Sequence, residues 1–125
     1  GLPQIDEWFE AEFVLADGTP AFAHVNMASE TWAMTIRATG NGGSATVMDF
    51  IHPQDDDRLM LDMYGSERIE HTGSRTTYMY QLEAFRAAVR EGRPFATTTV
   101  DSVATMELID ACYRAAGLSP RNAGS

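Results

Sequence analysis

The spacing of the hydrophobic residues changes about half-way along this chain, and that change constrains the fold more than any other feature. Up to residue 72, apolar residues alternate with polar ones, as they do in half-buried strands. From residue 76 onward they recur at intervals of three and four residues, as they do on one face of a helix. A chain with its strands first and its helices last is expected to form an α+β fold.

The first half of the sequence predicts about six strands joined by short turns. The expected strands span residues 9–15, 21–27, 32–38, 45–51, 59–63 and 67–72. Asp17-Gly18 and the glycine pair Gly42-Gly43 predict two of the turns. Some strands carry apolar residues on both faces, for example Phe22 and Val25, so we expect something to cover each face of the sheet.

The second half predicts two helices. Thr76 or Thr77 is expected to cap the first helix, and Gly92 is expected to end it. The second helix is expected to begin near Thr99 or Asp101. The apolar stripe of the first helix consists of Tyr78, Leu82, Phe85 and Val89.

These elements predict a single domain, residues 1–125, built on an open, mostly antiparallel sheet of about six strands. The two C-terminal helices are expected to pack on one face of that sheet. Because two helices cannot cover both faces, the remaining face is expected to meet another subunit or another domain.

Charge and composition exclude several classes of protein. The net charge is −9, and the basic residues are nine arginines scattered singly, so neither nucleic acid nor an anionic membrane is an expected partner. The chain has no apolar run long enough to span a bilayer and no signal segment. The single cysteine, Cys112, precludes an intrachain disulfide, is expected to be a buried small hydrophobe, and favours a cytoplasmic location.

No motif in the sequence indicates a group of catalytic residues. The glycine-rich segment 39–44 is followed by a strand instead of a helix, so it predicts a hairpin turn and not a phosphate-binding loop. The three histidines, His24, His52 and His71, are too far apart in sequence to match the spacing of metal ligands. The three aspartates that follow His52 are typical of a solvated loop. The residues therefore assign no catalytic, cofactor-binding or metal-binding position.

Two segments of the second half carry a family resemblance. They read YMYQLEAFRAAVREG at residues 78–92, followed by Pro94, and DSVATMELIDACYRAAGL at residues 101–118. The first resembles the late helix, and the second the closing helix, of Gfo/Idh/MocA-type oxidoreductases, with the dihydrodiol-dehydrogenase-like members the most similar. The resemblance is strong over residues 78–118 and loose over residues 9–72.

The resemblance implies a two-domain enzyme. Its N-terminal Rossmann domain would hold NAD or NADP on a GxGxxG turn, a lysine of an E-K-P motif would lie beside the transferred hydride, and its C-terminal open sheet would form the substrate crevice and the subunit interface. This chain has no GxGxxG before a helix, no E-K-P and no lysine, and the Asp and His motif that opens the family's second domain would precede Gly1. We therefore expect this chain to be the C-terminal, substrate-side domain, to bind no cofactor, and to be inactive alone.

The parent enzyme is then expected to transfer a hydride between NAD or NADP and the C–OH/C=O of a sugar, cyclitol or diol. This domain would supply a wall of the substrate crevice and form a homo-oligomer through its sheet. The substrate-facing candidates are Phe50 and His52, because they lie where a strand ends in an irregular loop and binding groups favour such loops.

Two alternatives stand beside this interpretation. The chain could be a stand-alone, non-catalytic binding or assembly module that uses the same sheet. It could also be a small cone-shaped α+β enzyme or ligand-binding domain, but these usually place helices before strands, which is the reverse of the order here.

Overall fold

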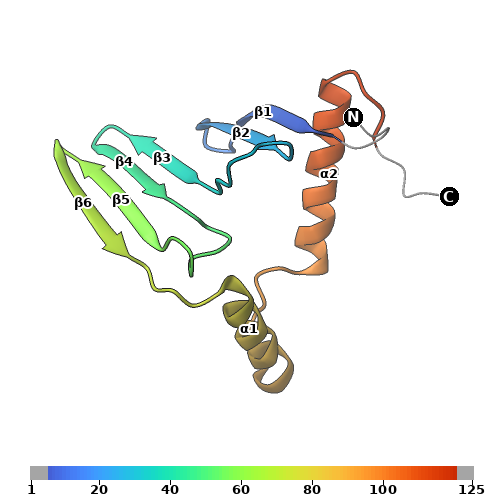
Figure 1. Cartoon of the computed structure of the whole chain (residues 1–125). Coiled ribbons are helices and arrows are strands. Elements are labelled where there is room, and N and C mark those ends of the chain that lie inside the picture. The colour runs from blue at the N-terminus through green and yellow to red at the C-terminus, as the bar shows by residue number, and fades with distance from the viewer. Residues whose placement is uncertain (1–5, 121–125) are drawn as a thin grey trace. The chain divides into compact units, whose positions relative to one another are not determined.

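Six strands precede two helices in the structure, a computed structural model that describes residues 6–120 (Figure 1). The α+β class predicted from the spacing is therefore confirmed. The strands are β1 (Trp8–Val14), β2 (Pro20–Asn26), β3 (Ile36–Gly40), β4 (Gly43–Val47), β5 (Arg58–Met63) and β6 (Ser66–His71), and the helices are α1 (Thr77–Glu91) and α2 (Thr99–Ala115).

The chain groups into two compact units, each of which has its own sheet. The terminal unit comprises the residues up to Glu30 together with those from Ala96 onward, and it contains β1, β2 and α2. The central unit, Thr31–Phe95, contains β3 to β6 and α1.

In the terminal unit, β1 and β2 form an antiparallel hairpin with Trp8 opposite Asn26 and Val14 opposite Pro20. The predicted turn forms because the Asp17 carboxylate accepts a hydrogen bond from the Thr19 amide (2.9 Å). One face of the hairpin carries half-buried apolar residues, Phe9, Ala11, Phe13, Ala21 and Ala23, and the other carries the Glu10–His24 ion pair.

In the central unit, β3, β4, β5 and β6 pair in chain order, each antiparallel to the next. The glycine-rich segment 39–44 is the β3–β4 turn, as predicted. Gly43 has a φ of +140°, and a Cβ there would collide with the carbonyl oxygen of Asp62 on the neighbouring strand. Glycine is therefore required at this position because the two backbones approach closely.

The prediction of one six-stranded sheet is wrong, because the strands divide into a sheet of two and a sheet of four. Residues 27–35 leave the strand conformation after β2, where the Asn26 side chain accepts a hydrogen bond from the Ala28 amide (2.9 Å) and turns the chain. The strand expected at 32–38 begins only at Ile36, because the Trp32 side chain bonds to Asp49 and Met34 forms an isolated bridge with Asp49. Tertiary contacts of residues 32–34 thus override their alternating pattern.

Both helix starts follow from local chemistry. The Thr76 hydroxyl accepts a hydrogen bond from the Met79 amide, and the Thr98 hydroxyl accepts one from the Asp101 amide. Gly92 ends α1 in the left-handed conformation (φ 66°), as predicted.

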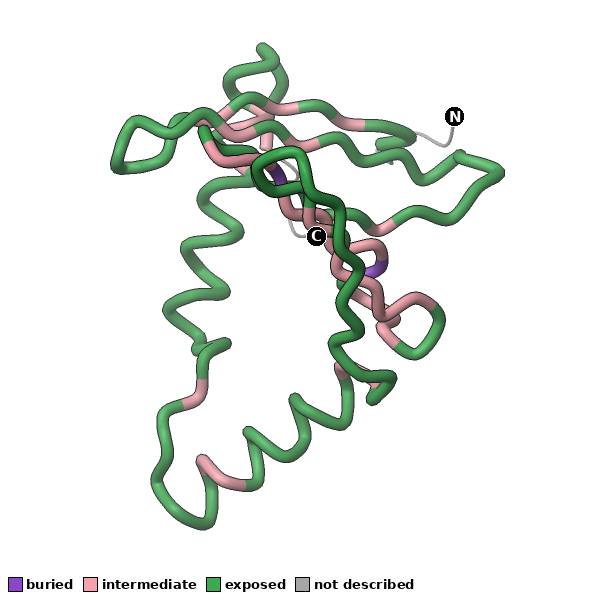
Figure 2. The backbone as a smooth tube through the Cα atoms, turned by 90° about the vertical axis from the view of Figure 1, so that its left-hand side faces the viewer, coloured by how far each residue is buried: buried purple, intermediate pink, exposed green. Residues whose placement is uncertain are grey.

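No apolar side chain is buried among the described residues. Figure 2 shows that most of the backbone belongs to exposed residues. The expected packing of α1 on the sheet of the central unit is not found, because α1 contains no buried residue and makes no extended contact with β3 to β6. Helix α2 also contains no buried residue, although its end lies beside β1 in the same unit. Hydrophobic burial normally supplies the main driving force for folding, and large exposed apolar surfaces are unusual in a folded unit.

Candidate functional site

The loop that follows β4 is organised around Asp49, the most buried residue among those described (5% exposed). Its carboxylate accepts hydrogen bonds from the backbone amides of Ile51 (3.0 Å) and His52 (2.7 Å). It also accepts one from the indole Nε1 of Trp32 (3.0 Å), which lies seventeen residues earlier in the chain. Three donors thus converge on one carboxylate and fix the loop.

Burial and hydrogen bonding act on Asp49 in opposite directions. Burial acts to raise the pKa of its carboxyl, whereas the hydrogen bonds from His52, Trp32 and Ile51 and the nearby His52 imidazole act to lower it. The bonds prevail, and the pKa of Asp49 lies below its ordinary value. Asp49 is therefore a fixed anion at neutral pH.

His52, a predicted substrate-facing residue, is held against Asp49 and Trp32. Its ring lies over the Trp32 indole with the ring centroids 5.1 Å apart and the planes tilted by 30°. Its Nδ1 lies 3.9 Å from the Asp49 carboxylate, which is too far for a hydrogen bond but close enough for attraction when the imidazole is protonated. The side chain remains 31% exposed, so the imidazole can both be positioned by the loop and reach a ligand.

Phe50, the other predicted residue, lies in the same loop and is 40% exposed. Its amide donates a hydrogen bond to the carbonyl of Met34 (3.0 Å), which ties the loop to the segment before β3. The strand expected at 45–51 ends at Val47, so Phe50 lies in the loop and not in the strand. The structure thus places Phe50 and His52 in one loop. It adds Trp32 and Asp49, which the sequence interpretation missed. Asp49 could have been identified from the sequence, because an aspartate in a turn commonly accepts hydrogen bonds from the backbone amides two and three residues later.

The loop is also joined to the start of α1. The Thr77 hydroxyl donates a hydrogen bond to the Ile51 carbonyl (2.9 Å). We define the loop cluster as Trp32, Asp49, Phe50, His52 and Thr77.

Two of the three aspartates that follow His52 contact basic side chains, and the third, Asp55, is exposed. Asp56 binds the Arg58 guanidinium through both carboxylate oxygens (2.7 and 2.5 Å), and this lowers the pKa of Asp56 to about 2. Asp57 accepts a hydrogen bond from His71 Nδ1 (2.7 Å) and one from the Gly73 amide (3.1 Å). No group of three metal-ligating side chains gathers anywhere in residues 6–120.

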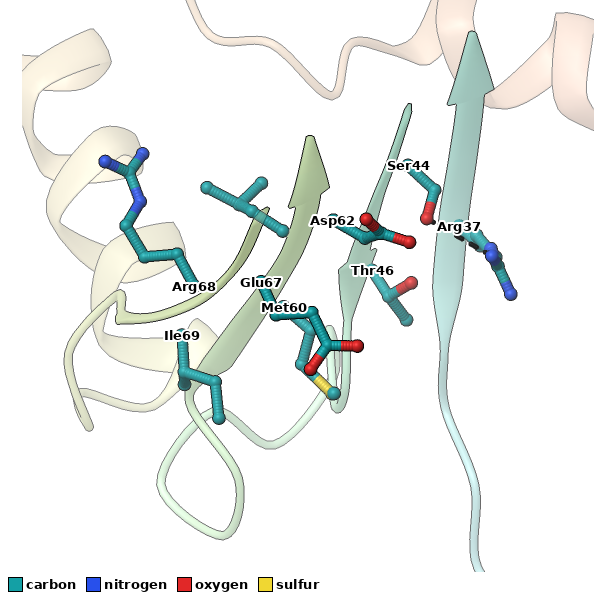
Figure 3. Close-up of a pocket in the computed structure, with 9 residues that line it drawn as sticks. Arg37, Ser44, Thr46, Met60, Asp62, Glu67, Arg68 and Ile69 are labelled. Carbon is teal, nitrogen blue, oxygen red and sulfur yellow. Dashed lines mark hydrogen bonds between the residues drawn. The ribbon is translucent and has the colours of Figure 1, made fainter. Parts of the chain in front are cut away.

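A second polar region lies on one face of the four-stranded sheet, where it lines a hollow of about 400 Å³ (Figure 3). Ser44 is buried there and accepts a hydrogen bond from the Arg37 guanidinium (3.2 Å). Asp62 stands opposite Ser44 on β5, and Glu67 stands opposite Asp62 on β6. The same face also carries Arg58 on β5 and His71 on β6, so basic and acidic side chains are interspersed on it.

The terminal unit has an apolar cavity of about 550 Å³ between β1 and the end of α2. Cys112 lines it together with Phe9 and Leu118. The cysteine is half-buried, which is less than predicted. Tyr113, which also lines this cavity, donates a hydrogen bond to the Asp6 carboxylate.

Comparison of the chain with models of known protein families, with curated proteins and with solved structures finds no significant match. Within residues 6–120, neither helix has the length and apolar character that crossing a bilayer requires.

Proposed function

We propose that this chain is the substrate-side and assembly domain of an NAD- or NADP-dependent oxidoreductase of the Gfo/Idh/MocA type. The observation that carries the proposal is the uncovered apolar surface, since residues 6–120 bury no hydrophobic side chain. A domain of this kind is completed by contact with a cofactor domain and with other subunits. The two helical segments that resemble the family, residues 78–92 and 101–118, supply the rest of the support.

The parent enzyme would move a hydride between the nicotinamide and the C–OH/C=O carbon of a sugar, cyclitol or diol. This chain has no lysine and no GxGxxG turn before a helix, so the cofactor site and the proton-transferring lysine would belong to the preceding Rossmann domain. The contribution of this chain would be to bind and orient the substrate and to exclude water.

The loop cluster is the part of the chain best suited to that task. The His52 imidazole lies against the Trp32 indole and 3.9 Å from the Asp49 carboxylate, and the ring remains partly exposed. A neutral imidazole carries one donor and one acceptor, so it can hydrogen-bond a substrate hydroxyl in either direction. Phe50 adds an exposed apolar ring for the carbon skeleton.

Replacing His52 with alanine tests the loop in the full-length enzyme. We expect kcat/KM for the polyol substrate to fall roughly tenfold to a hundredfold, because a hydrogen bond to the substrate is lost. His24→Ala is the control, since His24 lies in the terminal unit and pairs with Glu10. An unchanged kcat/KM in the His52 variant would remove this loop from the substrate site.

The gene itself separates this proposal from its alternative. Hydride transfer would be supported by two results together. The first is a strand–GxGxxG–helix unit and an E-K-P motif encoded upstream of Gly1. The second is substrate-dependent reduction of NAD or NADP by the full-length protein. A reading frame without a dinucleotide domain would refute hydride transfer. The same sheet would then be studied as the binding surface of a non-catalytic assembly module.

A further inference from the structure

Two hairpin turns lie at the same end of the four-stranded sheet, and a hydrogen bond joins them (Figure 1). Asn41 and Gly42 form the turn between β3 and β4, and Tyr64 and Gly65 form the turn between β5 and β6. The Tyr64 amide donates a hydrogen bond to the Gly42 carbonyl (2.8 Å). A change in the conformation of one turn therefore affects the other.

The second of these turns has an unusual residue at its first position. Tyr64 has a φ of +53°, in the left-handed region, and Gly65 has a φ of +77°. A two-residue turn with positive φ at both positions normally begins with asparagine or glycine, and a bulky side chain is unfavourable there. Such a conformation persists when contacts around it maintain it.

The Tyr64 side chain makes one such contact, with the first turn. A Cβ atom on Gly42 would lie 2.9 Å from the Tyr64 ring and from its hydroxyl oxygen, so the phenol lies directly over Gly42. The ring is otherwise 88% exposed. It therefore covers the peptide group between Asn41 and Gly42 without being buried itself.

The first turn leaves two reactive groups unrestrained. The Asn41 side chain is exposed and makes no hydrogen bond within residues 6–120. The Gly42 amide donates no hydrogen bond to the part of the chain that the structure describes. Glycines at 40, 42 and 43 surround the asparagine, and glycine adopts backbone conformations that other residues avoid. The turn can therefore bring the Gly42 nitrogen and the Asn41 side-chain carbonyl together.

These two groups can react with each other. The deprotonated Gly42 nitrogen attacks Cγ of Asn41, the N–Cγ bond forms, and the bond from Cγ to the side-chain nitrogen breaks. Ammonia leaves with the proton that the amide lost, and a five-membered succinimide remains. Water then opens the ring: cleavage at Cγ gives aspartate, and cleavage at the backbone carbonyl carbon gives isoaspartate. Either product adds one negative charge to the chain.

We propose that Asn41 is a site of spontaneous deamidation and isoaspartate formation, and that the Tyr64 ring over Gly42 slows the reaction. This inference goes beyond the proposed function and does not depend on it.

Other positions in the chain lack this combination of features. Of the three asparagines, only Asn41 precedes a glycine. Asn26 precedes a methionine, and its side chain accepts a hydrogen bond from the Ala28 amide (2.9 Å). Asp17 does precede a glycine, but the hydrogen bond from the Thr19 amide lowers the pKa of its carboxyl. Asp17 is therefore ionised, and a carboxylate is a poor electrophile.

Isoaspartate at position 41 would disturb this end of the sheet, because it adds an atom to the backbone of a two-residue turn. Gly43, the next residue on β4, lies so close to the Asp62 carbonyl that not even a Cβ atom fits between them. We expect the longer turn to weaken the pairing of Gly40 with Gly43. Since β3 is an edge strand that pairs only with β4 in this sheet, it is the strand that would be released.

Timed incubation of the unaltered chain at mildly alkaline pH, followed by peptide mapping, tests the site. Mass spectrometry detects the replacement of an amide by a carboxyl group, and methylation by an isoaspartate methyltransferase detects isoaspartate. We expect the peptide that contains Asn41 to deamidate at least about tenfold faster than the peptide that contains Asn26. Asn41→Gln should nearly abolish the reaction, because glutamine would have to close a six-membered ring. An Asn41 peptide that deamidates no faster than the Asn26 peptide would overturn the proposal.

Three further variants test the role of the ring. Tyr64→Gly removes the phenol but keeps the amide donor, and glycine suits the left-handed conformation, so the turn should still form. We expect it to raise the rate at Asn41 about threefold or more. Tyr64→Phe, which keeps the ring, should react at nearly the unaltered rate. So should Tyr78→Ala, which removes an exposed ring from α1.

An unchanged rate in Tyr64→Gly would refute the protective contact. Far-UV circular dichroism establishes that each variant is folded. Because these measurements need neither cofactor nor substrate, their failure removes the deamidation site alone, whereas a gene without a dinucleotide domain removes hydride transfer and leaves this site standing.

Discussion

The loop cluster and the apolar stripe of helix α1 belong to the same unit. The chain satisfies the polar groups of the loop cluster, but it does not bury the apolar stripe. Around Asp49, three donors from the chain itself satisfy a buried carboxylate. On α1, the apolar stripe of Tyr78, Leu82, Phe85 and Val89 is 57–69% exposed. A few residues can satisfy a polar group because hydrogen bonds are short and directional, whereas burying an apolar stripe needs a whole opposing surface. The loop is therefore held by bonds within the chain, whereas the apolar stripe of α1 remains exposed in it.

Removing the Asp49 carboxylate is expected to have the largest effect on the stability of the loop cluster. We expect Asp49→Ala to lower the free energy of unfolding of the central unit by about 2–4 kcal/mol, because it leaves the Trp32 indole and two backbone amides without their acceptor. Denaturant unfolding followed by Trp32 fluorescence, in a Trp8→Phe background, measures the change.

Asp55→Ala is the control for the Asp49 variant, because Asp55 is exposed and belongs to the same loop. We expect it to change the free energy of unfolding by less than about 0.5 kcal/mol. Equal effects of the two substitutions would show that the hydrogen bonds to Asp49 do not hold the loop.

Acid should weaken the same cluster to a smaller degree. The folded-state pKa of Asp49 is below its unfolded value, so folding favours the ionised carboxylate. Its contribution to stability is complete above pH about 4 and is lost as the pH falls through the folded-state pKa. Asp56, with a pKa of about 2, acts in the same direction.

Denaturation midpoints measured between pH about 6 and about 2 test this dependence. We expect the midpoint of the unaltered chain to fall with decreasing pH and that of Asp49→Asn to fall less steeply. Asp55→Asn should follow the unaltered chain. An Asp49→Asn curve parallel to the unaltered one would contradict the assignment of the lowered pKa to this network.

The smallest change in the free energy of unfolding is expected for substitutions in the exposed apolar stripe of α1. Leu82→Gln should change the free energy of unfolding by less than about 0.5 kcal/mol, because Leu82 is 63% exposed and glutamine has nearly the same helix propensity as leucine. Leu61→Gln, at a half-buried position in β5, should cost more. If Leu82→Gln lowered the free energy of unfolding by about 2–5 kcal/mol, as is typical for a buried leucine, Leu82 would be buried by the chain itself.

Sequence reasoning predicted the parts of this molecule that depend on near neighbours. Thr76 caps α1 and Gly92 ends it, and the Asp17-Gly18 turn forms, because each of these signals acts within a few residues. His52 was placed in an irregular loop for the same reason, whereas Phe50 was expected in the strand before it, which ends at Val47. The bond between Trp32 and Asp49 was missed, since the two residues are seventeen positions apart and no local pattern connects them. The bonds from Asp49 to the next amides are local and could have been predicted.

By itself, then, the sequence determined the order and type of the elements, the turns and caps, and the excess of apolar surface, because these follow from hydrophobic spacing and from side chains acting on adjacent backbone. Only the tertiary structure decided that the strands divide into two sheets, that Asp49 is the buried anion, and that Arg37 and Glu67 lie on one face at opposite edges. These features depend on strand register and on bonds between distant residues. A shift of one residue in the pairing would have placed the same side chains on the opposite face.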